Sequence, residues 1–130
     1  MSYLLDTNTV SFALRGIGGV AERLRTTPRE GVAVSSITVV ELRFGAAWKG
    51  SSRLERLIDA FLSGMSVLAF DELAAAQAGR LLAAKQRAGR SMEFRDGLLA
   101  AHALVLKRTL VTNNLRHFTG IEGLKIEDWQ

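Results

Sequence analysis

Tyr3-Leu4-Leu5-Asp6-Thr7-Asn8 is a short apolar run that ends in a carboxylate. Leu4 and Leu5 are typical of a fully buried strand, because the run is too short for a helix and is stopped by polar residues. In an open parallel α/β sheet, ligands bind beyond the carboxyl ends of the strands. If this is the central strand, Asp6 stands where a catalytic or metal-binding acid would stand. The alternative is that Asp6 only caps the following helix.

The composition limits the chemistry available to this chain. Its 130 residues fit a single domain, 1–130, and the absence of cysteine excludes disulfides, thiolate zinc sites and cysteine nucleophiles. His102 and His117 are the only histidines, so a metal would be held mainly by oxygen, which favours Mg²⁺ or Mn²⁺. A net charge of +4 suits a polyanionic partner, although it also simply favours solubility. Without a targeting segment or a run of about 18 apolar residues, we expect a soluble, cytoplasmic protein.

Short strands alternate with helices along the chain. Strands are expected within residues 3–5, 31–35, 66–70, 109–111 and 124–126. Helices are expected over residues 7–14 and 20–24, from Ser36 or Thr38 as N-cap to about 48, over 54–62, from Asp71 to near 89 with a buried stripe of Leu73, Ala74, Ala78, Leu81 and Leu82, and over 98–106 and 115–118. This alternation predicts an α/β fold with a mostly parallel sheet of four to five strands and helices on both faces.

Acidic and amide side chains recur where a buried strand hands over to a helix. Asp6 follows the first strand, Glu41 lies one turn into the helix after the second, Asp96 opens the apolar helix, and Asn114 follows the fourth strand. In a parallel sheet these positions share one edge, so the four side chains can converge there. Carboxylates this close disfavour each other's ionisation unless a cation neutralises them. The pattern therefore predicts a site for hard divalent cations, which can activate phosphoryl chemistry.

Each of these residues also has a purely structural interpretation. Thr38 and Glu41 have the spacing of a capping box. Asp96 at a helix start is favoured by the helix dipole, and Asn113-Asn114 suits a turn.

The two histidines are expected to have structural roles. Residues 98–106 are apolar on nearly every side, so His102 is expected to be packed rather than a ligand. His117 lies near the expected edge, where it either faces phosphate or is a surface residue.

Four motifs, in this order, resemble those of PIN-domain ribonucleases, and more closely those of VapC-type toxins of bacterial toxin–antitoxin pairs. They are Leu4–Asn8, Ser36–Leu42, Asp96–Ala103 and Leu110–Asn114, and the closing Gly123–Trp129 extends the resemblance over essentially the whole chain. The resemblance implies a three-layer α/β/α fold and an endoribonuclease dependent on Mg²⁺ or Mn²⁺. It also implies metal-assisted hydrolysis of RNA phosphodiester bonds.

The resemblance assigns roles to individual residues. Asp6, Glu41 and Asp96 match the acidic metal ligands, and Asn114 falls where many members carry a fourth acid, so it would contribute an oxygen but no charge. Arg95 is a departure, because relatives more often carry an apolar residue there; it would soften the carboxylate field or touch phosphate. The remaining assignments are Thr7, Asn8 and Thr112 as donors that orient the carboxylates, and Arg95, Arg116 and His117 as contacts to the nucleic acid.

The resemblance also implies partners, namely an RNA substrate, a small cognate antitoxin that blocks the crevice, and a second copy in a homodimer. Phe44 and Trp48 would belong to the antitoxin groove or to the core. Three other functions remain open. A catalytically silent module would bind nucleic acid or protein, and a DNA-directed nuclease would share the same site. A receiver-like phosphotransfer domain would need a lysine after the last strands, where Thr112-Asn113-Asn114 supplies none.

Overall fold

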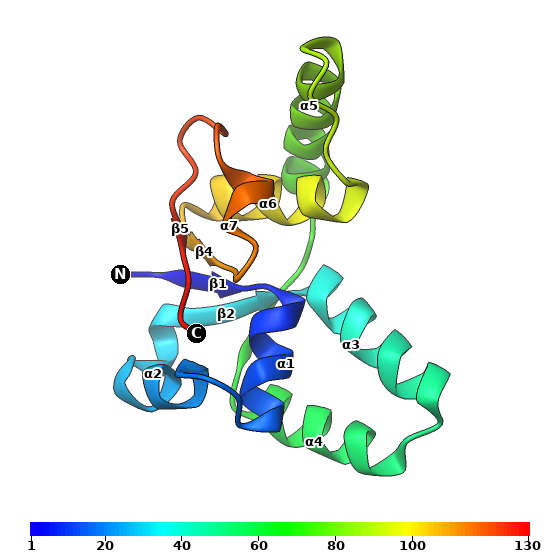
Figure 1. The fold of residues 1–130 in the computed structure, drawn as a ribbon, viewed down its shortest axis with the longest axis vertical. Helices are drawn as coiled ribbons and strands as arrows, with labels where there is room; N and C mark the ends of the chain where they lie inside the picture. The colour runs from blue at the N-terminus through cyan, green and yellow to red at the C-terminus, as the bar shows by residue number, and fades with distance from the viewer.

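A five-stranded parallel sheet runs through the middle of the protein in this computed structural model, which describes residues 1–130 (Figure 1). The strand order is β3-β2-β1-β4-β5, so the first strand of the chain is the central one. The elements are β1 Tyr3–Leu5, α1 Thr7–Arg15, α2 Val20–Thr26, a 3₁₀ turn Arg29–Gly31, β2 Val32–Ser35, α3 Ser36–Lys49, α4 Ser52–Ser63, β3 Ser66–Leu68, α5 Glu72–Arg87, α6 Phe94–Leu106, β4 Thr109–Val111, α7 Leu115–Phe118 and β5 Ile126–Glu127.

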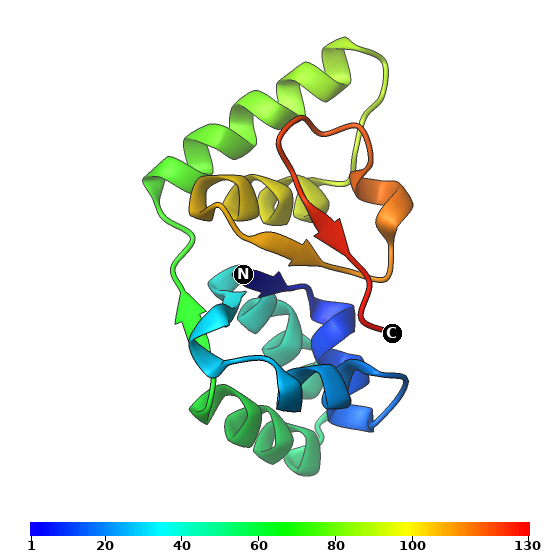
Figure 2. The same cartoon turned by 90° about the vertical axis from the view of Figure 1, so that its left-hand side faces the viewer.

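Helices cover both faces of this sheet, which confirms the predicted three-layer α/β/α fold. The alternating side chains of β1 separate two hydrophobic cores: Tyr3 and Leu5 pack with residues of α1 to α4, whereas Leu4 packs with residues of α6 and α7. Figures 1 and 2 show α1 to α4 on one side and α6 and α7 on the other, with α5 beyond α6 and at an angle to it. Because both faces are covered, the three inner strands β1, β2 and β4 are buried at every residue rather than at alternate ones.

The register of the sheet fixes where the polar ends of the strands lie. Leu5 is paired with Val34 of β2 on one side and with Val111 of β4 on the other. The residues that follow these three strands therefore emerge at one edge. The backbone N–H of Asp6 still donates to the carbonyl of Val111 (3.0 Å), so the first residue beyond β1 remains attached to the sheet.

The apolar helix α6 is packed at the centre of its layer, as its sequence predicts, and is buried at Gly97 and over residues 99–103. His102 is a packed residue, as expected. Its Nδ1 lies 2.9 Å from Ser35 Oγ, and burial lowers the pKa of the imidazole. Burial therefore favours the neutral form of its imidazole.

Four local predictions were wrong in detail. Helix α3 is capped by Ser35, whose Oγ accepts from the N–H of Ile37, and neither Ser36 nor Thr38 is the cap. The third strand ends at Leu68, and the fifth is Ile126–Glu127 rather than 124–126 because it pairs in register with β4. In α5, Leu73 is 69% exposed, so the buried stripe begins at Ala74.

Candidate active site

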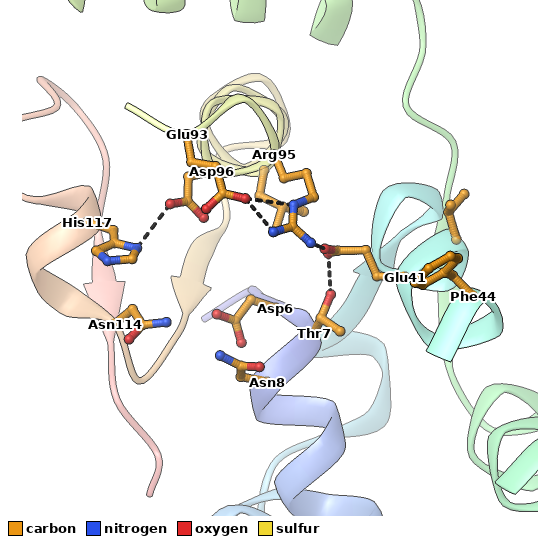
Figure 3. A pocket seen from close by; sticks show the side chains of 12 residues that line it. Asp6, Thr7, Asn8, Glu41, Phe44, Glu93, Arg95, Asp96, Asn114 and His117 are labelled. Atoms are coloured by element: carbon orange, nitrogen blue, oxygen red, sulfur yellow. Dashed lines mark hydrogen bonds and ion pairs between the residues drawn. The ribbon is translucent and has the colours of Figure 1, made fainter. Parts of the chain in front are cut away.

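A cavity of about 470 Å³ opens at the carboxyl edge of the sheet (Figure 3). It lies where β1 passes into α1, beside α3, the start of α6 and the segment after β4. Its polar lining contains all four side chains that the sequence predicts to converge, together with residues that the sequence did not single out. The lining residues are Asp6, Thr7, Asn8, Val40, Glu41, Phe44, Glu93, Arg95, Asp96, Leu99, Asn114 and His117.

Asp6 is the most deeply set acid of this cavity, with 6% of its surface exposed. It caps α1, because its Oδ1 accepts from the N–H of Thr9 at 2.8 Å. Burial raises the pKa of the carboxyl group, although hydrogen bonds from the side chain of Thr112 and from Thr9 act in the opposite direction. The two interpretations of Asp6 are thus both realised in its position: it caps the helix and it lines the cavity.

The side chain of Glu41, on α3, has partners on two sides. Its Oε1 accepts from Thr7 Oγ1 at 2.5 Å, and its Oε2 forms an ion pair of 2.6 Å with Nη1 of Arg95. The capping-box interpretation of Glu41 was wrong. Its carboxylate accepts hydrogen bonds from Thr7 and Arg95, and the helix begins at Ser36, before the expected cap Thr38. Thr7 therefore orients a carboxylate, as expected of it.

Asp96 faces the same cavity from the first turn of α6, with its side chain 20% exposed. Its Oδ2 lies 3.0 Å from Nδ1 of His117, which projects from α7. Burial raises the pKa of Asp96, and the nearby His117 acts in the opposite direction. His117 thus contacts an acid of the cavity rather than lying free on the surface (Figure 3).

The asparagine and threonine residues assigned to the site differ in their contacts with the acids. Asn114 lines the cavity, and its backbone N–H donates to the hydroxyl of Thr112 at 3.0 Å, so the turn is closed by Thr112 rather than by the asparagine side chains. Thr112 is fully buried and hydrogen-bonds Asp6, as expected of an orienting residue. Asn8 lines the cavity without a hydrogen bond to a carboxylate, and Arg116 lines a neighbouring cavity instead.

The chemistry of these side chains fits a hard divalent cation. Carboxylate and amide oxygens are the ligands that Mg²⁺ and Mn²⁺ prefer, and a cation beside Asp6 would offset the cost of burying its charge. In the present arrangement, however, no three His, Asp or Glu side chains are grouped closely enough to hold a metal ion. Glu41 is instead paired with Arg95, and Asp96 with His117. A cation that bound to the same oxygens of Glu41 and Asp96 would therefore compete with Arg95 and His117.

Glu93 and Val40 line the cavity although the sequence did not single them out. Glu93 precedes α6 and forms an ion pair with Arg95, which also bonds Glu41. The available signal was its spacing, because residues three apart at a helix start lie on the same side, and Asp96 follows Glu93 by three. Val40 and Phe44 also line the cavity, and Phe44 stacks with Trp48 on the exposed face of α3, so neither aromatic ring belongs to the core.

Comparison with known proteins identifies the class to which this fold and site belong. The family model for the PIN domain matches residues 3–123, so the chain belongs to the PIN domain family. Among its full-length relatives are VapC proteins. The chain is 34% identical to the tRNA(fMet)-specific endonuclease VapC of Salmonella typhimurium, with 99% of this chain and 98% of that protein covered. It is 30% identical to ribonuclease VapC2 of Rickettsia felis, with the same coverage.

The solved structures agree with this assignment. The DNA-bound VapBC structure from Salmonella typhimurium matches with a TM-score of 0.88 and 35% identity, covering 100% of this chain and 99% of that chain. The VapBC2 structure from Rickettsia felis, bound to a DNA fragment from its promoter, matches with a TM-score of 0.85 and 29% identity over the full length of both chains. As to membranes, none of the helices combines the length and the apolar character needed to cross one.

Proposed function

We propose that this chain is an endoribonuclease toxin that depends on Mg²⁺ or Mn²⁺ and is neutralised by a cognate antitoxin. The observation that carries the proposal is the meeting of Asp6, Glu41, Asp96 and Asn114, from four separate segments, in one cavity at the carboxyl edge of a parallel sheet. Relatives of the same length are named ribonuclease VapC2 and tRNA(fMet)-specific endonuclease VapC, and the similar solved structures include VapBC structures.

The acids of the cavity would hold the metal, with Asp6 and Asp96 as its main ligands and Glu41 sharing it. Thr112 and the N–H of Thr9 keep Asp6 pointed at the cavity, and Thr7 does the same for Glu41. A divalent cation bound there supplies Lewis-acid activation of the phosphodiester and of the attacking water. Asn114 would offer an amide oxygen, which is neutral. The substrate phosphate would therefore supply more of the negative charge that balances the cation.

In the protein without a metal, Arg95 is paired with Glu41 and His117 is bonded to Asp96. Both side chains would be released when a cation takes their place. Arg95 has 60% of its side chain exposed, so its guanidinium can turn toward a phosphate without leaving the cavity mouth. Such a contact contributes affinity but does not read sequence. The bases of single-stranded or looped RNA can be splayed out, which makes such segments the preferred targets.

For the partners, we propose that the antitoxin blocks the cavity and that the chain forms a homodimer. The antitoxin has support in the VapBC complexes among the related structures. The homodimer rests on the family resemblance alone. Sedimentation analysis of the purified chain decides between monomer and dimer.

Asp6→Asn is the sharpest test of the proposed activity. Asparagine is as good an N-cap as aspartate, so α1 keeps its cap while the cavity loses its deepest charge. We expect cleavage of RNA in Mn²⁺ to fall by at least about 100-fold, as with the loss of comparable catalytic groups.

Asp71→Asn is the matched control, because Asp71 caps α5 through the same kind of bond, Oδ1 to the N–H of Ala74 at 3.0 Å, away from the cavity. It should cleave like the unmodified chain. A folded Asp6→Asn variant that still cleaves at the original rate would contradict the proposal, whereas an unmodified chain that cleaves no RNA in Mn²⁺ would favour a silent binding module. Matched RNA and DNA hairpins, assayed side by side, separate an RNase from a DNA-directed nuclease.

A further inference from the structure

A second cavity, of about 490 Å³, adjoins the acidic one. It lies between the C-terminal turns of α5, the segment leading into α6, and α7. Glu93, Asp96 and His117 line both cavities, so the second is a lateral continuation of the first. Figure 2 shows these three segments lying together on the side of the sheet that carries α5 to α7.

Positive charge dominates the part of this second cavity that lies away from the acids. Lys85, Arg90 and Arg116 line it. The only polar contact of the Lys85 Nζ is the carbonyl of Gly120, at 3.3 Å, and neither Arg90 nor Arg116 has an ion pair.

The two acids of the second cavity do not neutralise these cations, because both acids already have partners. Glu93 pairs with Arg95, and Asp96 is bonded to His117. By contrast, Arg23 and Arg43 each form an ion pair with a carboxylate elsewhere in the chain. Cations gathered in a hollow without carboxylate partners repel one another, and an anion placed among them removes that cost.

We infer that this second cavity, lined by Lys85, Arg90 and Arg116, binds a phosphodiester group of the RNA strand next to the one that is cut. The inference rests on the proposed ribonuclease function. Because the two cavities share a wall, one RNA strand bound at the acidic cavity would also reach the second cavity. The lining contains a single apolar residue, Met92, so the cavity offers no platform for stacking a base. It therefore contributes affinity and the direction of the strand rather than sequence choice.

The test is a binding measurement that needs neither metal nor cleavage. Arg90→Gln combined with Arg116→Gln removes two cations whose side chains bond nothing else, so the fold should be kept. Binding of a fluorescein-labelled single-stranded RNA is measured by anisotropy in EDTA over a series of salt concentrations. For single strands the loss of one phosphate contact lowers the salt slope by about 0.7. At about 0.1 M salt this corresponds to about fivefold weaker binding.

The matched control is Arg53→Gln combined with Arg56→Gln. Both arginines are exposed on α4, on the opposite side of the sheet, and neither forms an ion pair. This double variant loses the same net charge, so the inference predicts binding within about twofold of the unmodified chain. Equal weakening by both double variants would show that only net charge matters, and unchanged binding by the Arg90 and Arg116 variant would also overturn the inference. Neither result bears on cleavage, because the proposed function would be refuted separately by undiminished cleavage in a folded Asp6→Asn variant.

Discussion

Replacing Gly97 by alanine tests how closely α6 must approach α5 to hold Asp96 in place. Gly97 is buried in the first turn of α6, directly after Asp96. A Cβ at this position would lie 2.4 Å from Cδ2 and 2.8 Å from Cγ of Leu82 on α5. Both separations are far below ordinary van der Waals contact, so Leu82 or the whole of α6 must move. Overpacking of this kind costs about 1–3 kcal/mol.

The helix propensity of alanine offsets part of this cost, because it exceeds that of glycine by about 1 kcal/mol within a helix. The matched control, Gly79→Ala, is made in α5, where an added Cβ meets nothing within 4 Å. This control should raise the free energy of unfolding by about 1 kcal/mol. Since both variants gain the same propensity, the difference between them isolates the clash. We expect urea titration to show Gly97→Ala less stable than Gly79→Ala by about 1–3 kcal/mol.

A second comparison identifies Leu82 as the cause. In a Leu82→Ala background the clash is absent, so Gly97→Ala should become stabilising, in the manner of the control. If Gly97→Ala stabilises the unmodified chain as much as Gly79→Ala does, the close approach of the two helices does not depend on glycine. The inference that Asp96 is held in place by a close approach that only glycine at position 97 allows would then be refuted.

Two further predictions concern the charges of the acidic cavity. Burial raises the pKa of Asp6 above 3.8, so the folded chain binds more protons than the unfolded chain in the window above that value, and stability falls as pH rises through it. Asp6→Asn should therefore raise the melting temperature in EDTA at pH 7, by an amount that shrinks as the pH approaches 3.8; a lower melting temperature at pH 7 would contradict this. Arg95→Gln removes the cation shared by Glu41 and Glu93, so Mn²⁺ should raise the melting temperature more in this variant than in the unmodified chain, and equal shifts would speak against competition.

The strands and the positions of the acids could be predicted because they depend on local pattern. The inner strands are short apolar runs buried on both faces, but burial alone does not single out β1 as the central strand, because β2 and β4 are buried as completely. The cap of α3 could not be predicted with the same accuracy, because Ser35, Ser36 and Thr38 are all competent caps. Pairing of Val34 and Ser35 with β3 holds the backbone extended up to Ser35, and this places the cap there.

The contacts among the site residues could not be predicted, because they join distant parts of the chain. Arg95 bonds Glu41 across 54 positions, and His117 bonds Asp96 across 21. The periodicity of apolar residues in the sequence does not indicate which distant side chains pair. The sequence places acids at one edge, but only the relative placement of α3, α6 and α7 decides which cations reach them. Glu93 was missed because its place in the site depends on Arg95, which also pairs with the distant Glu41.

Asp6 shows why structural and functional interpretations of one residue need not compete. A helix that starts directly after a buried strand leaves N–H groups without partners, and an acid there satisfies one of them. The same geometry places that acid at the carboxyl edge of the sheet, where it is desolvated and its pKa is raised. The cap therefore holds in place a charge that is costly without a cation. Asp71 caps α5 through an equivalent bond outside the cavity, so capping explains how such an acid is fixed, and only its location explains what it can bind.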